Sequence, residues 1–328
     1  MTNVTIEKKV RAYTNIALIK YWGKRDEAAI LPTSSSLSLT LDAFYTETSV
    51  AFKEDITQDT FYLNGVLQNE AATQKVSRFL KLFREPTGIQ TPALIKSTNF
   101  VPTAAGLASS ASGMAALAGA ANLASGLNLP DQELSTYARR GSGSATRSIY
   151  GGFVEWQMGT SSEDSYAVPI DDANWDIGML VVVVNSRQKE VSSRDGMKNT
   201  VETSPFYAGW LESTAKDLIE IKKAIHSHDF QKVGEITESN GMKMHGTMLG
   251  ANPPLSYWEP DSVVAMQLVR QLRKEGIPCY FTMDAGPNVK VLCRLSDSEK
   301  IKARFAEVFR TEQLIVSRPG KGLQIMSN

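Results

Sequence analysis

The sequence predicts an α+β fold built from about two structural units. The chain has 328 residues, and a domain takes roughly 150. Strand-like runs and amphipathic helices are mixed without the strict alternation that marks a doubly wound parallel sheet. Hydrophobic residues make up 42% of the chain and charged residues 21%, as in globular proteins with a sizeable core. We place the division near Asp176, so that residues 1–176 form the first unit and residues 177–328 the second.

Charge and cysteine content exclude several classes of protein. Lys and Arg total 35 and Asp and Glu total 35, whereas a general nucleic-acid binder usually carries a basic excess. Cys279 and Cys293 are too few for a disulfide framework and lack metal-ligand spacing, which is typical of reduced thiols in a cytoplasmic protein. The first residues show no apolar core of a signal peptide. Residues 97–130 carry no charge, but Pro102, Gly106 and Gly126 interrupt them, so we expect no membrane span.

Short strands separated by turns are expected in the first half. The Asn64-Gly65 pair is typical of a tight hairpin turn. Runs of apolar and β-branched residues predict strands over residues 37–44, 46–52, 61–63, 93–96 and 151–156.

Helices are expected between these strands. Residues 71–83 place four apolar side chains on one face, namely Val76, Phe79, Leu80 and Phe83. A second helix begins at Ser109, and its small residues imply close packing on several sides. A third runs from Asp131 to about Gly141.

The second half opens with a buried strand over residues 179–184. Helices are predicted over residues 205–226 and 229–240, the latter closed by Gly241, and from a cap at Asp261 to Gly276. Two strands, residues 279–283 and 289–295, flank a turn at residues 284–287. Ser296 and Glu299 have the spacing of a capping box for a further helix.

The loop at residues 102–110, Pro-Thr-Ala-Ala-Gly-Leu-Ala-Ser-Ser, opens the alanine-rich helix. The N-terminus of a helix presents unpaired N–H groups and the positive end of the dipole, and both hold anions. Small residues let the backbone approach a phosphate, and serine hydroxyls add donors or reach a phosphate-bound Mg²⁺. An ordinary tight loop before a core helix has the same composition. The spacing matches neither the Walker nor the Rossmann pattern.

Two further motifs place cations beside aromatic or hydroxyl groups. In residues 15–24, Lys20 and Lys24 surround an aromatic pair at the end of an apolar run, where they either face a cleft or extend into solvent from a strand end. Residues 141–148 combine four hydroxyls, two glycines and Arg147. That set suits a polyanion, although a flexible Ser/Gly loop has the same residues.

Residues 189–196 repeat the hydroxyl-and-arginine pattern at Ser193-Arg194. Asp284 lies between an apolar strand and a Gly-Pro turn, where it acts either as a general base or as a turn cap. The sequence lacks a histidine-based nucleophile system and a metal-ligand cluster. The motifs together favour phosphoryl chemistry on a small anionic substrate, in which positioning and charge stabilisation dominate.

These motifs resemble the GHMP kinase superfamily and, within it, the diphosphomevalonate decarboxylase family. PTAAGLASSAS is similar to the superfamily phosphate loop, with Ala108 where a second glycine is usual. That departure, with NIALIKYWGK, GSGSATRS and YFTMDAGPNVK, resembles the decarboxylases from about residue 11 to residue 295. The resemblance implies the GHMP kinase fold. In it, a ribosomal-protein-S5-like N-terminal half with a left-handed β-α-β unit adjoins a ferredoxin-like C-terminal half, and ligands bind in the cleft between them.

The resemblance also implies a reaction. ATP phosphorylates the 3-hydroxyl of mevalonate 5-diphosphate, the new phosphate leaves, and loss of CO₂ gives isopentenyl diphosphate in the mevalonate pathway. ATP and Mg²⁺ are the implied cofactors. The implied protein is a cytoplasmic homodimer that binds neither nucleic acid nor membrane.

Roles for single residues follow from the matched motifs. Asp284 is the expected base or orienting group, and Lys20, Ser193 and Arg194 complete the catalytic set. The expected substrate-binding residues are Asn15, Tyr21, Trp22, Gly23, Lys24, Arg78, Gly143, Ser144, Ala145, Thr146, Arg147, Ser148 and Thr203. The expected ATP-binding residues are Ser97, Pro102, Ala105, Gly106, Leu107, Ala108, Ser109, Ser110, Ser112 and Lys189, with Ser109 also the expected Mg²⁺ ligand.

Three alternatives stay open from the sequence. A kinase of the same superfamily would phosphorylate without losing CO₂, and a related decarboxylase would act on a monophosphate. The anion-binding residues Tyr21, Lys24, Arg78, Ser144 and Arg147 favour a diphosphate. A non-catalytic phosphate or nucleotide sensor is the third alternative, but it would need no base at Asp284.

Overall fold

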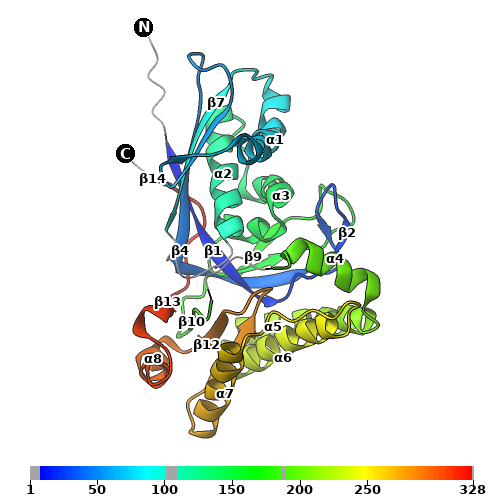
Figure 1. Ribbon diagram of the computed structural model, residues 1–328, viewed down its shortest axis with the longest axis vertical. Helices are drawn as coiled ribbons and strands as arrows, with labels where there is room; N and C mark the ends of the chain where they lie inside the picture. Colours follow the sequence, from blue (N-terminus) through cyan, green and yellow to red (C-terminus); the bar gives the residue numbers. More distant parts are fainter. Residues whose placement is uncertain (1–7, 101–108, 186–189, 327–328) are drawn as a thin grey trace.

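The structure is a computed structural model that describes residues 8–100, 109–185 and 190–326. It has two large sheets, each covered by helices, with further helices between them, and a small two-stranded sheet (Figure 1). The α+β prediction is confirmed.

The first sheet has a central path of strands in the order β14-β1-β4-β7-β5-β6. The strands β8 and β9 extend it beside β4. The pairs in this sheet are antiparallel except β5 with β7, which are parallel and connected through β6 and α1. The bounds are β1 Lys9–Ile19, β4 Ser36–Phe52, β5 Thr60–Leu63, β6 Val66–Leu67, β7 Ala93–Phe100, β8 Phe153–Trp156, β9 Ala167–Asp171 and β14 Gln324–Met326.

The strand β4 is a single strand of 17 residues where the sequence predicts two. Its register against β1 shifts: Tyr13 pairs with Tyr45, but Thr14 pairs with Leu41. The residues between Leu41 and Tyr45 form a bulge that bends the strand without ending it, and Phe44 in this bulge is fully buried. The predicted break therefore corresponds to this bulge.

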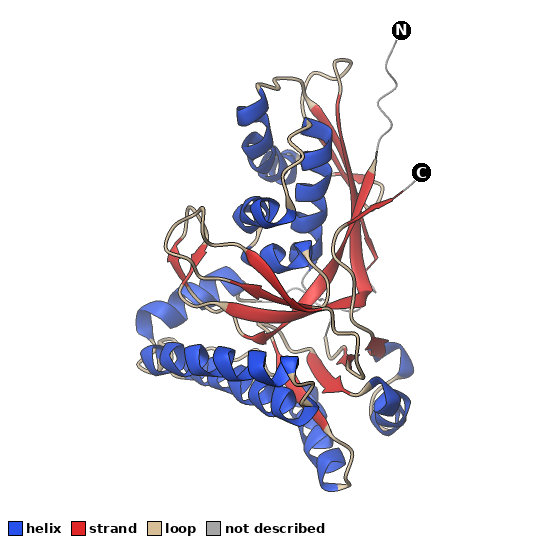
Figure 2. Ribbon diagram, turned by 180° about the vertical axis from the view of Figure 1, so that it is seen from behind, coloured by secondary structure: helices blue, strands red, loops and turns tan. Residues whose placement is uncertain are grey.

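Helices α1 (Glu70–Thr87), α2 (Ser109–Ser125) and α3 (Asp131–Gly141) lie together on one face of the first sheet (Figures 1 and 2). The predicted apolar face of α1 is confirmed, because Val76, Phe79, Leu80 and Phe83 are buried. Helix α2 packs against β1, β4 and α3, and its alanines allow this close approach. The 3₁₀ segment η1 (Gly143–Ile149) follows α3 directly.

The second sheet is antiparallel, in the order β11-β12-β10-β13. Its strands are β10 Gly178–Val182, β11 Cys279–Met283, β12 Val289–Cys293 and β13 Leu314–Ser317. Helices α7 (Pro260–Lys274) and α8 (Ser298–Ala306) pack on one face. Helices α5 (Tyr207–His226) and α6 (Phe230–Leu249) form the other layer, in a core shared with β1 and β4 of the first sheet. The two halves are thus joined by a common core.

Three predictions in the second half are wrong. Helix α6 continues past Gly241 to Leu249, because the glycine lets the helix lie close to β11: an added Cβ would lie 2.8 Å from Thr282 Oγ1. Glu259, rather than Asp261, caps α7 through a capping box with Ser262. Ser296 donates to Asp176 instead of capping α8, which begins at Ser298.

The chain crosses back to the first sheet at its C-terminal end. After β13, Gly320 N–H donates to Thr40 and β14 pairs with β1. The hydrogen bonds of this pairing join β14, the last described strand, to β1. None of the helices in the described ranges is long and apolar enough to cross a bilayer.

Candidate active site

A cavity of about 350 Å³ lies where elements of both halves meet. The ends of β1 and β11, the first turns of α2 and α4 (Ser193–Thr203), and η1 all supply residues to it. It is lined by Asn15, Ala17, Lys20, Tyr21, Trp22, Lys24, Ile30, Ser110, Ala111, Gly141, Ser142, Gly143, Ser144, Arg147, Ser193, Arg194, Met197, Met244, Asp284 and Ala285.

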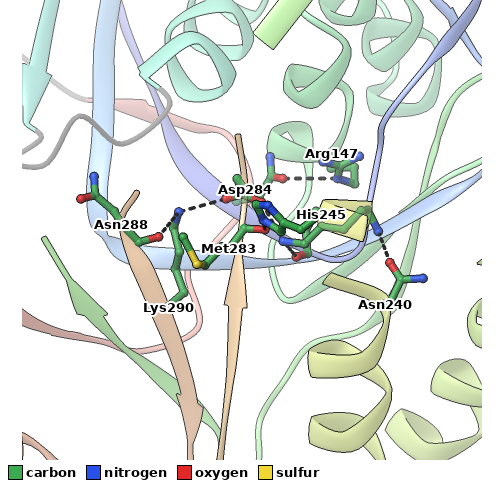
Figure 3. A network of polar contacts seen from close by, with 10 residues as sticks. Arg147, Asn240, His245, Met283, Asp284, Asn288 and Lys290 are labelled. Carbon is green, nitrogen blue, oxygen red and sulfur yellow. Dashed lines mark hydrogen bonds and ion pairs between the residues drawn. The ribbon is translucent and has the colours of Figure 1, made fainter. Parts of the chain in front are cut away.

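Asp284 lies between two lysines, Lys20 and Lys290, and Figure 3 shows its contact with Lys290. Lys20 follows β1, and its Nζ is 2.8 Å from Asp284 Oδ1 and also donates to the carbonyl of Ala17. Lys290, on β12, has its Nζ 3.2 Å from Asp284 Oδ2. Each carboxylate oxygen therefore faces its own ammonium group.

Burial and charge act in opposite directions on these groups. Burial lowers the pKa of Lys20 to about 8, although the Asp284 carboxylate partly opposes this shift. For Asp284, burial alone would raise the pKa, but Lys20 and Lys290 outweigh it and hold the pKa well below its usual range. Asp284 is therefore ionised near neutral pH, whereas Lys20 keeps its proton there and loses it as the pH rises through about 8.

Helix α6 supports both members of this pair. Asn240 Oδ1 accepts the backbone N–H of Lys20 at 2.9 Å. His245 Nε2 lies 3.4 Å from the carbonyl of Met283, the residue before Asp284 (Figure 3). Trp258 Nε1 donates to Nδ1 of His245. Burial lowers the pKa of His245 to about 4, so it is neutral near pH 7. These contacts fix the backbone on either side of the cavity.

Arg147 places a buried guanidinium group at the cavity. Only 2% of its surface is exposed. Its Nη1 donates to Ser36 Oγ and its Nε to Asn15 Oδ1, while Asn15 Nδ2 donates to Ser148 Oγ and the carbonyl of Ser144. Burial lowers its pKa to about 10, which leaves it charged at neutral pH. Such a cation favours an anionic ligand.

The segment Tyr21–Lys24 forms an aromatic and cationic side of the cavity. The buried Tyr21 hydroxyl has no hydrogen-bond partner among the described residues. Lys24 begins the hairpin of β2 (Lys24–Asp26) and β3 (Leu31–Pro32) and pairs with Glu27 at 2.6 Å. Gly23 has φ 135°, and an added Cβ would lie 1.8 Å from the Tyr207 hydroxyl, so the backbone requires glycine here.

The first turn of α4 forms the opposite side. Ser192 caps this helix by accepting from Asp195 N–H, and Ser193 and Arg194 then line the cavity. Met197 and Met244 add an apolar wall that continues into a cluster with Trp22 and Tyr257. The cavity is thus cationic on several sides and apolar on one.

The structure brings most of the residues predicted for catalysis or substrate binding to this cavity, but not all. Gly23, Ala145, Thr146 and Ser148 belong to the segments that shape it without lining it. Arg78 is exposed on α1, and Thr203 accepts from Asn252 N–H at the end of α4; neither lines the cavity.

The residues predicted to bind ATP are only partly described. Ser110 lines the cavity, while Ser112 is fully buried against Thr14 and Thr46. Ser97 lines a second cavity of about 290 Å³. Helix α2 begins at Ser109, whose side chain is not described, and the remaining residues lie outside the described ranges: Pro102, Ala105, Gly106, Leu107, Ala108 and Lys189.

Sequence reasoning assigned no role to Lys290, Asn240 or His245. Lys290 had a usable signal, since it is the one charged residue in an otherwise apolar strand. Asn240 and His245 act through backbone groups of Lys20 and Met283, which only the packing of α6 reveals.

Two family profiles cover most of the chain. Residues 12–167 match the diphosphomevalonate decarboxylase-like N-terminal domain, and residues 179–323 match the mevalonate 5-diphosphate decarboxylase C-terminal domain. The chain belongs to the diphosphomevalonate decarboxylase family. The predicted resemblance is confirmed. Lys20 and Arg147 fall in the first family range and Arg194 and Asp284 in the second, so the decarboxylase cavity draws on both domains.

Individual members of the decarboxylase family are similar over nearly the whole chain. A structure of MDDEF in complex with MVAPP, AMPPCP and magnesium is 56% identical, has a TM-score of 0.93, and matches 98% of this chain and 99% of its own. The mevalonate diphosphate decarboxylase from Enterococcus faecalis is 56% identical, with a TM-score of 0.92 and the same coverage. The diphosphomevalonate decarboxylase of Saccharomyces cerevisiae is 40% identical over 322 residues, 92% of this chain and 81% of that protein.

Proposed function

We propose that this protein catalyses the ATP-dependent decarboxylation of mevalonate 5-diphosphate to isopentenyl diphosphate, releasing ADP, phosphate and CO₂. The observation that carries the proposal is the ionised Asp284 held between Lys20 and Lys290 in a cavity that also contains Arg147. Family membership supports the substrate and the reaction.

Asp284 is the group proposed to act on the 3-hydroxyl of the substrate. Its carboxylate accepts the hydroxyl hydrogen bond and takes the proton as the oxygen bonds to the γ-phosphorus of ATP and ADP leaves. The C3–O bond to the new phosphate then breaks. The carboxylate of the substrate is lost as CO₂, and its bonding electron pair forms the double bond. Because the pKa of Asp284 is low, its carboxylate is a weak base. Orientation of the hydroxyl is therefore the larger part of its contribution.

The cationic side chains are proposed to hold the three anionic groups of the ligands. Arg147, Ser144 and Lys24 are proposed for the diphosphate and carboxylate of the substrate, and Ser193 and Arg194 for its reacting end. Lys20 is proposed to stabilise the transferring phosphoryl group, where charge develops. The apolar wall of Met197 and Met244 excludes water beside the carbon that becomes electron-deficient.

The first turn of α2 is the proposed binding place for the phosphates of ATP, because a helix N-terminus favours anions. MDDEF binds AMPPCP and magnesium, which supports both ligands here. Mg²⁺ commonly binds through nucleotide phosphates. Ser109, at the start of α2, is the proposed protein ligand of Mg²⁺, as the family resemblance implies.

Incubation with ATP, Mg²⁺ and mevalonate 5-diphosphate tests the function. We expect ADP, phosphate and CO₂ in equal amounts. ADP formation without CO₂ would indicate a kinase, and turnover of the monophosphate in preference to the diphosphate would indicate the related decarboxylase.

The variant Asp284→Ala tests the proposed role of the carboxylate. We expect turnover to fall below detection, while calorimetry shows that the variant still binds mevalonate 5-diphosphate. Near-normal turnover in this variant would contradict the mechanism.

We also propose that residues 1–176 and 177–328 are the two domains and that the protein is a cytoplasmic homodimer. The support is the resemblance to the family. Light scattering coupled to gel filtration measures the oligomeric state, and a mass of 35.9 kDa would indicate a monomer instead.

A further inference from the structure

Lys290 is a buried lysine on an interior strand of the second sheet. Strand β12 lies between β10 and β11, and Lys290 pairs with Val181 on one side and Thr282 on the other. Its neighbours in the strand are Val289, Val291, Leu292 and Cys293. A side-chain exposure of 5% is unusual for a lysine, because a buried ammonium group is costly unless it is paired.

The alternation of the strand explains where this lysine points. Val289, Val291 and Cys293 belong to the core under α7 and α8, whereas Leu292 belongs to the core shared with α5, α6 and β1. Lys290 shares the face of Leu292, since side chains two apart lie on the same side of a strand. An apolar residue would suit that face equally well, so packing alone does not account for a lysine.

Its polar contacts centre on Asp284. Lys290 Nζ lies 3.2 Å from Asp284 Oδ2 and donates to the carbonyl of Asn288 at 3.2 Å. Lys20 Nζ lies 2.8 Å from the other oxygen, Oδ1. Rotation of the carboxylate would weaken both contacts, so the two lysines define one orientation (Figure 3).

Lys290 does not line the cavity, although Asp284 does. We propose that Lys290 is a positioning residue for the reaction: its ammonium group fixes the orientation of the Asp284 carboxylate at the cavity, without touching either substrate. This inference rests on the proposed function, in which Asp284 acts on the 3-hydroxyl.

The charged and titratable groups around Asp284 come from four elements. Lys20 follows β1, Lys290 is on β12, Arg147 is on η1, and His245 on α6 is neutral because burial lowers its pKa to about 4. Lys290 contributes to the low pKa of Asp284 and to the lowered pKa of Lys20. Removing its charge therefore raises the pKa of both groups.

The test compares Lys290→Met, Lys290→Arg and a control, Lys222→Met. Lys222 pairs with the buried Glu155 at 2.9 Å but does not line the cavity, so the control also removes the lysine partner of a carboxylate. For Lys290→Met we expect kcat to fall roughly 10–100-fold, the loss seen when the groups that orient metal ligands are removed, with little change in KM for mevalonate 5-diphosphate. We expect Lys290→Arg to recover part of kcat and Lys222→Met to match the wild type.

The pH profile separates positioning from a general loss of stability. In Lys290→Met the alkaline limb of kcat/KM, which we assign to Lys20, should move to higher pH, because a neighbouring positive charge has gone. A kcat loss with an unmoved limb, or an equal loss in Lys222→Met, would overturn the proposal. Thermal unfolding of each variant establishes that it is folded.

A second measurement does not depend on activity. The carboxyl group of Asp284 is titrated by ¹³C NMR in protein labelled at aspartate, with Asp284→Asn to assign the signal. Its pKa should rise in Lys290→Met, and an unchanged pKa would overturn the inference. If the wild-type protein is inactive but the pKa of Asp284 still rises in Lys290→Met, the proposed function is refuted. The contact of Lys290 with Asp284 is then established on its own.

Discussion

Arg147 carries its charge in a side chain that is almost completely buried at the cavity wall. Its guanidinium group donates to Ser36 and Asn15 and forms no ion pair with a carboxylate among the described residues. A buried cation without a counter-ion is costly, and a bound anion would offset that cost. The residue is therefore expected to contribute more to ligand binding than to the stability of the free protein.

For Arg147→Ala we expect kcat/KM to fall by an amount equivalent to about 2–5 kcal/mol, the cost of removing one partner from a buried charge pair. Arg147→Lys should recover only part of it, because lysine lacks the planar fork. Steady-state kinetics measure both. Arg78→Ala is the comparison: Arg78 is exposed on α1 and outside the cavity, so kcat/KM should hardly change. Equal losses in both variants would contradict this assignment.

Lys20 sets the expected pH dependence at the alkaline end. Its ammonium group is proposed to stabilise the transferring phosphoryl group, and burial lowers its pKa to about 8. Activity should therefore be retained below that pH and fall as the pH rises through about 8. Tyr21 does not titrate in this range, because burial raises its pKa. The measurement is kcat/KM against pH, with unfolding monitored at each pH, and no decline above about 8 would contradict the role of Lys20.

At the scale of an element, the position of α6 depends on its glycines. Gly234 and Gly241 are seven residues apart and face β11, where added Cβ atoms would lie 1.9 Å from the ring of Tyr280 and 2.8 Å from Thr282 Oγ1. Because neither glycine has a side chain, the helix can lie close to the sheet. The same approach brings Asn240 to Lys20 and His245 to Met283.

Two substitutions in α6 test this close approach. Gly234→Ala should reduce the free energy of unfolding by about 1–3 kcal/mol, because the methyl group overpacks against Tyr280. Gly246→Ala meets open space in the same helix and should increase it by up to about 1 kcal/mol, since alanine favours the helix. Denaturant unfolding measures both, and destabilisation of similar size in the two variants would count against the packing explanation.

Most elements could be predicted from the sequence because their signals are local. The apolar period of α1 and the Asn64-Gly65 turn between β5 and β6 needed no distant partner. The failures have a different origin. Gly241 is a stop signal in an isolated helix, but here the closeness of β11 makes glycine necessary. Ser296 has the spacing of a cap, yet Asp176, 120 residues away, binds it first.

At the scale of the whole molecule, the segment after β13 returns to the first sheet, where β14 pairs with β1. Gly152 N–H donates to Gly320, and Leu323 N–H donates to Ile149. The segment after β13 thus ties the second half to the first sheet. With the core shared by β1, β10 and α5, it makes separate unfolding of the halves unfavourable.

Removal of residues 319–328 should lower the free energy of unfolding by about 3–5 kcal/mol, because several backbone hydrogen bonds worth about 1 kcal/mol each are lost. The full-length protein should unfold in a single calorimetric transition. A truncated chain of unchanged stability would show that the returning segment contributes little.

The fold class, the family and most of the residues at the cavity follow from the amino-acid sequence alone. Small residues, lone charges and glycines in local motifs limit the backbone and the chemistry that each segment can support. Lys20, Arg147, Ser193, Arg194 and Asp284 were all identified in this way, and the structure brings them to one cavity.

The pairing of these residues depends on how distant elements pack. Lys20 and Asp284 are 264 positions apart, and their contact depends on β1, α6 and β11 packing in one arrangement. The same packing adds Lys290 and leaves Arg78 outside. Local patterns do not record such contacts, because a strand's period tells which face a side chain takes but not which distant group lies opposite.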